Sequence, residues 1–336
     1  MSRIALPPYP NGWFGIGHSD QLGKGQTLAV HYLGRDLVVW RGEDGGVRAA
    51  DAFCPHLGAH LGKGGKVEGN TIRCPFHGWR FEGEHGKCVE IPYAKRIPAK
   101  AELELIPALE CNGMILVWHH LEGKAPEWKP EVVPEILDPD YALHRTHEWT
   151  IKSHPQEIME NGVDFAHFTT LHGWKCKAIH WEPDGPYYRL KIDVDTGAED
   201  QAATASVTTD VDSFNSGPGF LYTRFKGQMD GIAVNALTPV GPEKLHIMHR
   251  YYAHKRCDPA VVKGFFDFYV NDYNLDVPIW SNKLYRETPL LAEPEKDFGR
   301  FRRWYRQFYS NPEASEAEDR TNKSDSTAGV PERGVL

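Results

Sequence analysis

"CPHLGAH", Cys54 to His60, and "CPFHGW", Cys74 to Trp79, stand close together in the first third of the chain. Each stretch opens with Cys-Pro, and a histidine follows the cysteine two or three residues later, at His56 and His77. Cysteine and histidine are scarce residues, whereas the proline and glycine in each stretch are residues that turn a backbone. We therefore expect two short loops that converge and present two thiolates and two imidazoles to one metal site.

Two metal chemistries fit a set of two cysteines and two histidines. A zinc ion would take all four ligands in one tetrahedron, whereas a Rieske [2Fe-2S] cluster places both cysteines on one iron and both histidines on the other. Zinc fingers usually take their cysteines from one local element and their histidines from another. Because each loop here supplies one cysteine and one histidine, the sequence favours the Rieske cluster, with a zinc protein as the alternative.

The composition is that of a folded globular protein of 336 residues, with 40% hydrophobic and 25% charged residues. The net charge of -8 argues against a general nucleic-acid partner. No apolar run is close to the length of about 20 residues that is needed to cross a bilayer. The N-terminal stretch lacks the apolar core of a secretory signal. We therefore expect a cytoplasmic protein whose six cysteines are reduced thiols or metal ligands.

The pattern along the chain divides it into two structured regions. Runs of β-type residues broken by glycine-rich turns, from about Thr27 to Trp118, predict a small antiparallel domain. After a proline-rich charged segment, the pattern predicts a helix over 153–168, further strands, and helices over about 259–276 and 298–308. The last residues have almost no large apolar side chains, which is typical of a disordered tail. The predicted divisions are a first domain at 1–120, a connecting segment at 121–140, a second domain at 141–310 and a tail at 311–336.

"ENGVDFAHFTTLHGW", residues 160–174, is the candidate for a second metal site. Asn161, Asp164 and His167 stand three apart and are expected to share one face of a helix. His172 can join them on one metal only if that helix ends before it, and "TTLHG" favours such an ending. Two histidines and a carboxylate form the facial triad of non-haem Fe(II) oxygenases. Taken alone the string is as often a core or capping arrangement, but a Cys-His cluster motif precedes it.

A carboxylate from elsewhere in the chain could complete such a triad, and Asp276 is our first choice. In "VVKGFFDFYVNDYNLDVPIW", residues 261–280, Asp276 falls on the apolar face of a predicted helix, where a carboxylate needs a cation. The alternative is that Asp276 caps a helix that begins at "VPIW", with Pro278 in its first turn. Asp272 is the reserve candidate.

"CPHLGAHLGKG" and "CPFHGWRFEGEHGKC" resemble the cluster-binding loops of the Rieske non-haem iron oxygenases, and the family also carries a D-x-x-H-x-x-x-x-H string in its catalytic domain. The resemblance implies a Rieske [2Fe-2S] cluster and a mononuclear Fe(II) as cofactors. Asp164 is similar to the aspartate that links, by hydrogen bonds, a cluster histidine of a neighbouring subunit to an iron-ligating histidine. With Asn161 it is a candidate catalytic residue. The implied ligands are Cys54, His56, Cys74 and His77 for the cluster, and His167, His172 and Asp276 for the iron.

Flanking stretches such as "YPNGWFGIG", "IPYAKRIP" and "DVPIWSNKLYRETPLL" are similar to the branch that holds the 3-ketosteroid 9α-hydroxylase oxygenase component and the cholesterol 7-desaturases. This resemblance implies monooxygenation of a lipophilic polycyclic substrate, in first place a steroid. Three alternatives stay open: sterol desaturation, hydroxylation or O-demethylation of an aromatic compound, and an electron carrier whose second domain is only a scaffold.

The resemblance also implies the fold and the partners. It predicts an α+β protein: an antiparallel β Rieske domain joined to a helix-grip, START-like catalytic domain in which an antiparallel sheet wraps a long helix. Electrons are expected from an external NAD(P)H-dependent reductase or ferredoxin, in agreement with the absence of a G-x-G-x-x-G motif. They are expected to cross between subunits of a homotrimer, where O2 and the substrate meet at the iron.

Overall fold

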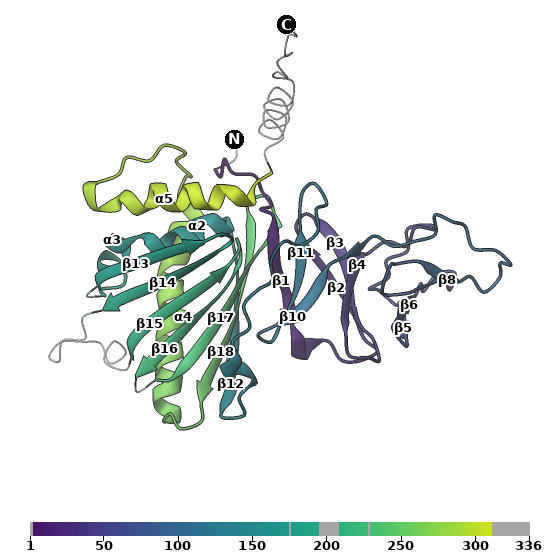
Figure 1. Cartoon of the computed structure of the whole chain (residues 1–336), viewed down its shortest axis with the longest axis horizontal. Helices are drawn as coiled ribbons and strands as arrows, with labels where there is room; N and C mark the ends of the chain where they lie inside the picture. The colour runs from purple at the N-terminus through teal and green to yellow at the C-terminus, as the bar shows by residue number, and fades with distance from the viewer. Residues whose placement is uncertain (1–2, 175, 195–207, 228, 311–336) are drawn as a thin grey trace, which may run out of the picture.

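A computed structural model of the chain describes residues 3–174, 176–194, 208–227 and 229–310. The predicted disordered tail, 311–336, lies outside these residues. The described chain forms two β-rich regions side by side, a smaller N-terminal one and a larger one built on a single broad sheet (Figure 1). Among the described residues, no helix combines the length and the apolar character needed to cross a membrane.

The N-terminal region is the small antiparallel domain that the sequence predicts. It contains three sheets, with strand orders β1-β11-β10, β2-β3-β4-β9 and β5-β6-β7-β8, and every pairing is antiparallel. The β5–β8 sheet lies at the far end of the molecule in Figure 1. The strands are β1 (Gly12–His18), β2 (Thr27–Tyr32), β3 (Arg35–Arg41), β4 (Val47–Asp51), β5 (Lys66–Glu68), β6 (Thr71–Arg73), β7 (Arg80–Phe81), β8 (Cys88–Glu90), β9 (Leu105–Ile106), β10 (Ala108–Cys111) and β11 (Met114–His119).

The C-terminal region is a seven-stranded antiparallel sheet in the order β12-β18-β17-β16-β15-β14-β13. The long helix α4 runs across one face of this sheet, which is the predicted helix-grip arrangement (Figure 1). The strands are β12 (Tyr141–Ile151), β13 (Cys176–Asp184), β14 (Tyr187–Val194), β15 (Thr208–Ser216), β16 (Phe220–Gly227), β17 (Gly231–Gly241) and β18 (Lys244–His254). The α-helices are α1 (Pro134–Leu137), α2 (Pro155–Glu160), α3 (Phe165–Thr170), α4 (Pro259–Asn282) and α5 (Lys296–Tyr305), and the 3-10 turns are η1 (Ser19–Gln21), η2 (Asn161–Val163), η3 (Glu293–Glu295) and η4 (Arg306–Phe308).

The single helix predicted over 153–168 is wrong, because the segment is broken into α2, η2 and α3. The break comes at Asp164, whose backbone is extended and whose side chain accepts a hydrogen bond from the His167 N–H as the N-cap of α3. A short acidic side chain gains more from capping a new helix than from continuing an old one. Asn161, Asp164 and His167 therefore do not share one helix face.

Helix α4 begins as its sequence suggests but ends later than predicted. Asp258 caps it by accepting from the Ala260 N–H at 2.7 Å, and Pro259 occupies the first turn. The helix then continues through Pro278 to Asn282. Asp276 consequently lies inside α4 and does not cap a separate helix, so the capping alternative is wrong.

The two regions share a hydrophobic core where β1 and β11 pack against the large sheet. Trp13 and Leu116 from the N-terminal strands are buried together with Ala236 and Met248 from β17 and β18. At Gly15 a Cβ atom would lie 2.5 Å from the Cβ of Ala236, so only glycine permits this close approach of β1 to β17. This packing holds the two regions in a fixed relation within one chain.

Candidate metal centres

The loops that carry the first candidate site repeat one backbone turn. The Gly58 N–H donates to the Cys54 carbonyl oxygen at 2.9 Å, and the Gly78 N–H donates to the Cys74 carbonyl oxygen at 3.1 Å. Both glycines have a φ of 73°, in the left-handed region that other residues rarely adopt. Both loops therefore turn in the same way after their cysteine, as the Cys-Pro and glycine pattern predicts, with the histidine at the second or third residue of the turn.

The side chains of these loops converge, with the cysteines inside and the histidines outside. Cys54 and Cys74 are only 2% and 4% exposed, whereas His56 and His77 are half-buried and their ring centroids lie 4.7 Å apart. Burial raises the pKa of Cys54 to about 12, so a stable thiolate there needs a cation. The Nδ1 atom of His77 is buried without a hydrogen-bond partner. Two inner thiols and two outer imidazoles fit the split ligation of a [2Fe-2S] cluster.

Aromatic contacts hold the outer histidines in place. The ring of His56 stacks on Trp79, with centroids 4.5 Å apart and planes 8° from parallel. The Trp79 Nε1–H in turn donates to the Tyr93 hydroxyl at 2.8 Å. Tyr93 belongs to the "IPYAKRIP" segment, so this segment supports the site although it offers no ligand.

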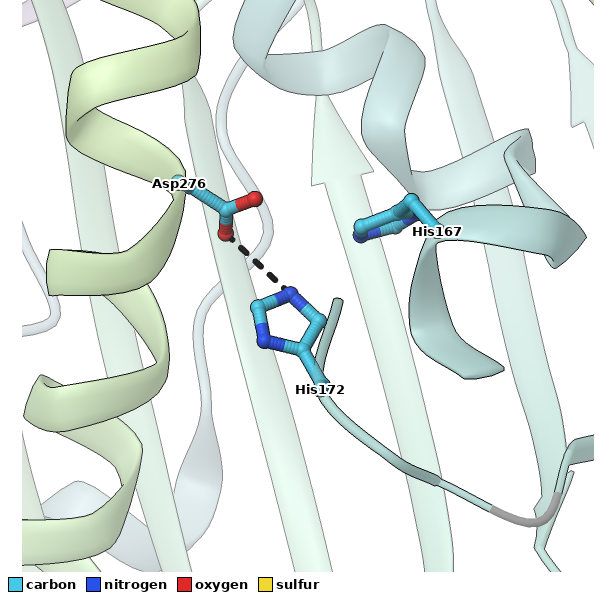
Figure 2. Close-up of side chains that lie close together, drawn as sticks. All are labelled: His167, His172 and Asp276. Carbon is cyan, nitrogen blue, oxygen red and sulfur yellow. Dashed lines mark ion pairs between the residues drawn. The ribbon is translucent and has the colours of Figure 1, made fainter. Parts of the chain in front are cut away.

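The second candidate site brings together the three predicted ligands, which come from three separate elements. His167 lies in α3, His172 follows the end of that helix as predicted, and Asp276 lies on α4. One ligand atom from each lies within 4.8 Å of the others, so the three can hold one metal ion. Figure 2 shows the two imidazoles and the carboxylate pointing toward a common centre, and Asp276 Oδ2 lies 3.4 Å from His172 Nε2.

The two imidazoles differ in how their Nδ1 atoms are held. His167 Nδ1 lies 2.7 Å from the backbone oxygen of Asp164, which can only accept, so Nδ1 carries the proton and Nε2 keeps its lone pair for a metal. His172 lies between two carboxylates: its Nδ1 atom is 3.7 Å from Asp272 and has no hydrogen-bond partner, whereas its Nε2 atom is 3.4 Å from Asp276. Burial works to lower the pKa of His172, but the hydrogen bond and charge of Asp276 and the charge of Asp272 raise it.

Asp272 and Asp276 have different surroundings, although both face His172. Asp276 Oδ1 accepts from Asn161 Nδ2 at 3.2 Å, and Asn161 Oδ1 accepts from Trp280 Nε1 at 3.3 Å. Asp272 Oδ2 accepts from Trp174 Nε1 at 3.1 Å, and burial raises the pKa of Asp272 to about 6. Asp276 belongs to the three-ligand group, whereas Asp272 lies behind His172.

Sequence reasoning missed these supporting contacts. Asp272 was expected only as an alternative to Asp276 as the carboxylate ligand, although their spacing of four residues puts both on one helix face. No role was expected for Trp174, and Asn161 was expected to lie beside Asp164 rather than beside Asp276. Neither indole donor carries a signal in the sequence, because its acceptor lies about a hundred residues away in the chain.

Asp164 sits at the edge of the second site and is partly open to solvent. Its Oδ1 atom caps α3 at 3.2 Å from the His167 N–H, and its Oδ2 atom lies 3.8 Å from His167 Nδ1. The side chain is 24% exposed. Asp164 is thus in contact with a candidate ligand and accessible from outside the chain.

A cavity opens onto the second site between the helices and the large sheet. Its empty volume, open mouth and adjoining solvent included, is about 820 Å³. Apart from the candidate ligands and a few amides and hydroxyls, its lining is apolar and aromatic. The apolar lining includes Ile158, Met159, Phe168, Leu190, Ile192, Leu221 and Leu237.

A domain with a Rieske-type pair of loops, joined to a helix-grip domain with a two-histidine, one-carboxylate site, defines the class of two-centre iron oxygenases. The Rieske [2Fe-2S] domain family matches residues 12–105, and the 3-ketosteroid 9alpha-hydroxylase C-terminal domain family matches residues 117–309. The chain therefore belongs to the 3-ketosteroid 9α-hydroxylase family of Rieske non-haem iron oxygenases. It is an oxidoreductase with a [2Fe-2S] cluster and a mononuclear iron as its cofactors, and such an oxygenase component takes electrons from a reductase or ferredoxin.

Curated relatives match over most of their length. The cholesterol 7-desaturase of Xenopus laevis is 34% identical over 91% of this chain and 73% of its own. A probable 3-ketosteroid-9-alpha-monooxygenase oxygenase component of Rhodococcus rhodochrous is 30% identical over 92% of this chain and 83% of its own.

Solved structures share the fold at lower identity. Dicamba monooxygenase bound to dicamba superimposes with a TM-score of 0.69 at 18% identity, covering 89% of this chain and 96% of that one. Pseudomonas putida CBB5 NdmA with caffeine gives a TM-score of 0.71 at 20% identity, covering 88% of this chain and 89% of that one.

Proposed function

We propose that the chain inserts one oxygen atom from O2 into a lipophilic substrate of the steroid class. Substrate C–H, O2, two electrons and two protons give the alcohol and one water. The electrons come from an external NAD(P)H-dependent reductase or ferredoxin. The observation that carries the proposal is the mainly apolar cavity that opens onto His167, His172 and Asp276.

The roles of the site residues follow from their contacts. Iron held by two histidines and a carboxylate supplies coordination positions for O2 beside the substrate. The Asp164 carbonyl keeps the proton on the Nδ1 atom of His167, and the Asp272 carboxylate places a negative charge 3.7 Å from the Nδ1 atom of His172. Asn161 holds the Asp276 carboxylate in position. The proposed ligands are Cys54, Cys74, His56 and His77 for the cluster, and His167, His172 and Asp276 for the iron.

The steroid class is supported by the cavity and by the names of the relatives. A rigid fused-ring hydrocarbon needs a cavity with apolar walls and few polar groups, and this lining has that character. Relatives at 30% and 34% identity are named for a 3-ketosteroid and for cholesterol. The structures with dicamba and caffeine share the fold alone at 18% and 20% identity, so they give no support to an aromatic substrate.

Desaturation is the second candidate outcome, because the 34% identical relative is named a cholesterol 7-desaturase. The same ligands and cavity serve both outcomes. Hydroxylation adds one oxygen atom to the substrate, whereas desaturation removes two hydrogen atoms and reduces O2 to water. The mass of the product separates the two.

The test is a panel of sterols and ketosteroids incubated with the purified chain, NADH and a surrogate reductase, with products identified by mass spectrometry. We expect oxygen from labelled O2 in a steroid product, and no product from His167→Ala. If only aromatic compounds are converted in a matched panel, the steroid proposal is wrong.

We also propose that electrons cross between subunits of a homotrimer. In Figure 1 the β5–β8 sheet next to the cluster loops and helix α3 lie at opposite ends of the molecule, so transfer within one chain would have to cover nearly its whole length. Leu57, Phe76 and Tyr93 expose 62% to 65% of their surface around the cluster loops, as a contact surface would.

Mixed assemblies test this route. Chains with Cys54→Ser lack a working cluster, and chains with His167→Ala lack a working iron site. Co-expression of the two, followed by tandem affinity purification, should restore part of the activity, because an intact cluster then faces an intact iron site in the neighbouring subunit. Mixed assemblies as inactive as each variant alone would contradict transfer between subunits.

We also propose that the protein is located in the cytoplasm. The six cysteines are all free, as expected in a reducing compartment, where reduced pyridine nucleotide also supplies the electrons.

A further inference from the structure

Two carboxamides stand on the sheet face that lines the cavity. Asn215 on β15 pairs directly with Leu221 on β16, and Leu221 pairs directly with Asn235 on β17. Residues that are directly opposite one another in adjacent strands point to the same face of a sheet. All three line the cavity, so two amides flank one leucine in a single row across its wall.

These two amides are buried without the hydrogen bonds that such groups require. Asn215 and Asn235 are each 1% exposed. Asn215 Oδ1 has no hydrogen-bond partner, and neither has Asn235 Oδ1 or Nδ2. Burial raises the pKa of Tyr269 and of Tyr273, and hydrogen bonding to Asn235 works to lower it, so both hydroxyls approach Asn235, whereas Asn215 Oδ1 has no partner.

The next polar pair along the same strands shows the contrast. Ser213 and Thr223 also line the cavity, but their hydroxyls bond to each other at 2.7 Å. A buried amide without a partner is unfavourable in the free protein, and a ligand that supplies the missing partner recovers that loss. The row of Asn215 and Asn235 is therefore a place where a polar group of a ligand gains affinity.

The position of the amides relative to the metal ligands follows from α4. Tyr269 and Tyr273 precede Asp276 by seven and three residues on the same helix. At about 1.5 Å per residue, Asn235 beside these tyrosines lies roughly 5 to 10 Å from Asp276 along the helix axis, and Asn215 lies two strands further across the sheet. A ligand can thus place a polar group at the row and a carbon atom beside the metal ligands.

We propose that Asn215 and Asn235 recognise a hydroxyl group of the substrate, in preference to a ketone at the same position. Each carboxamide offers a donor and an acceptor, whichever way it is turned. A hydroxyl both donates and accepts, whereas a ketone only accepts and leaves an amide oxygen unpaired. This inference deepens the proposed function and rests on it, because it names the polar group that the steroid-class substrate carries.

Three ligands with one carbon skeleton test the proposal: cholestanol, cholestanone and cholestane, which carry a hydroxyl, a ketone and no polar group. Each is delivered in cyclodextrin to the purified chain, and its Kd is measured from the quenching of tryptophan fluorescence, since Trp174 and Trp280 line the cavity. We expect cholestanol to bind about tenfold more tightly than cholestanone, with cholestane weakest. Asn215→Leu should reduce the difference between the first two to less than about twofold.

Ser213→Ala is the matched control, because it removes a hydroxyl from the same strand that already has a partner, and the preference for cholestanol should persist. The thermal midpoint of Asn215→Leu separates recognition from a structural role: an amide that makes no bond in the free protein can be replaced without lowering the midpoint. A lowered midpoint would indicate a structural role and overturn the assignment.

The outcomes also separate this inference from the proposed function. If the wild-type chain binds the three ligands equally or prefers cholestanone, the hydroxyl inference is overturned and the steroid proposal stands. If it binds none of them, both are overturned. The wild-type comparison decides this even if a variant fails to fold.

Discussion

The cluster loops and the second metal site differ in how far apart in the sequence their candidate ligands lie. The loops repeat one turn, closed at Gly58 and Gly78, and all four candidate ligands lie between Cys54 and His77. The second site joins a short helix, the residue after it, and a carboxylate more than a hundred residues later. The first geometry is fixed by local backbone conformation, whereas the second depends on how α3 packs against α4.

This difference implies different vulnerabilities. In the loops each candidate ligand is held mainly by its own turn, with Tyr93 as a support from outside, so changes in the loops themselves should have the largest effect on the cluster. In the second site Asn161, Asp272 and Trp174 hold the ligands from outside, so changes in residues that bind no metal should still weaken it.

Cys54→Ser should have the largest effect, because it removes a buried thiol that we propose as a ligand of the cluster. We expect loss of the visible absorbance and of turnover, with a fall in the free energy of unfolding of at least about 3 kcal/mol. Cys88→Ser is the control, since Cys88 lies in the same hydrophobic core but its thiol bonds to the Glu90 carbonyl oxygen. A cluster that survives Cys54→Ser would remove this residue from the ligand set.

Asp276→Asn and Asp272→Asn should show which of the two carboxylates beside His172 binds the iron. We expect Asp276→Asn to lose nearly all mononuclear iron, and Asp272→Asn to weaken iron binding by about 10- to 100-fold. Metal analysis gives the iron content, and unchanged visible absorbance shows that the cluster is intact. The reverse order of the two variants would make Asp272 the ligand.

The same contrast explains what the sequence could predict. The convergence of the two Cys-His loops could be predicted because the residue spacing is local, and the position of His172 beyond a helix end could be predicted from "TTLHG". The unbroken helix over 153–168 was wrong because the capping preference of Asp164 outweighs helix continuation.

Other features depend on tertiary structure and could not be predicted. Asp272 and Asp276 share a helix face, and only tertiary contacts distinguish them: Asp276 accepts from Asn161, Asp272 accepts from Trp174, and His172 lies between the two. The row of Asn215 and Asn235 depends on the register of three strands, which no local pattern specifies.

Asp164→Asn tests the edge where the two sites are proposed to meet. Asparagine is as good an N-cap as aspartate, so α3 and both metal sites should remain intact. Without the carboxylate charge next to His167, we expect electron delivery to slow by about 10-fold or more. This corresponds to a rise in the activation free energy of electron transfer of at least about 1.4 kcal/mol. Single-turnover oxidation of the reduced cluster measures this rate. A rate equal to that of the wild type would limit Asp164 to capping α3.

Glu148→Gln should have the smallest effect, because it alters the junction between the two regions rather than either site. Glu148 accepts from His18 and His246 at 3.0 Å each, and so links β1 to β12 and β18, but its side chain is 41% exposed. Water screens such a pair, so we expect the free energy of unfolding to fall by no more than about 1 kcal/mol. Cluster absorbance and iron content should not change, since the shared apolar core around Trp13 and Met248 holds the regions together. Thermal unfolding with metal analysis checks both points, and loss of either metal in this variant would show that the junction also controls the sites.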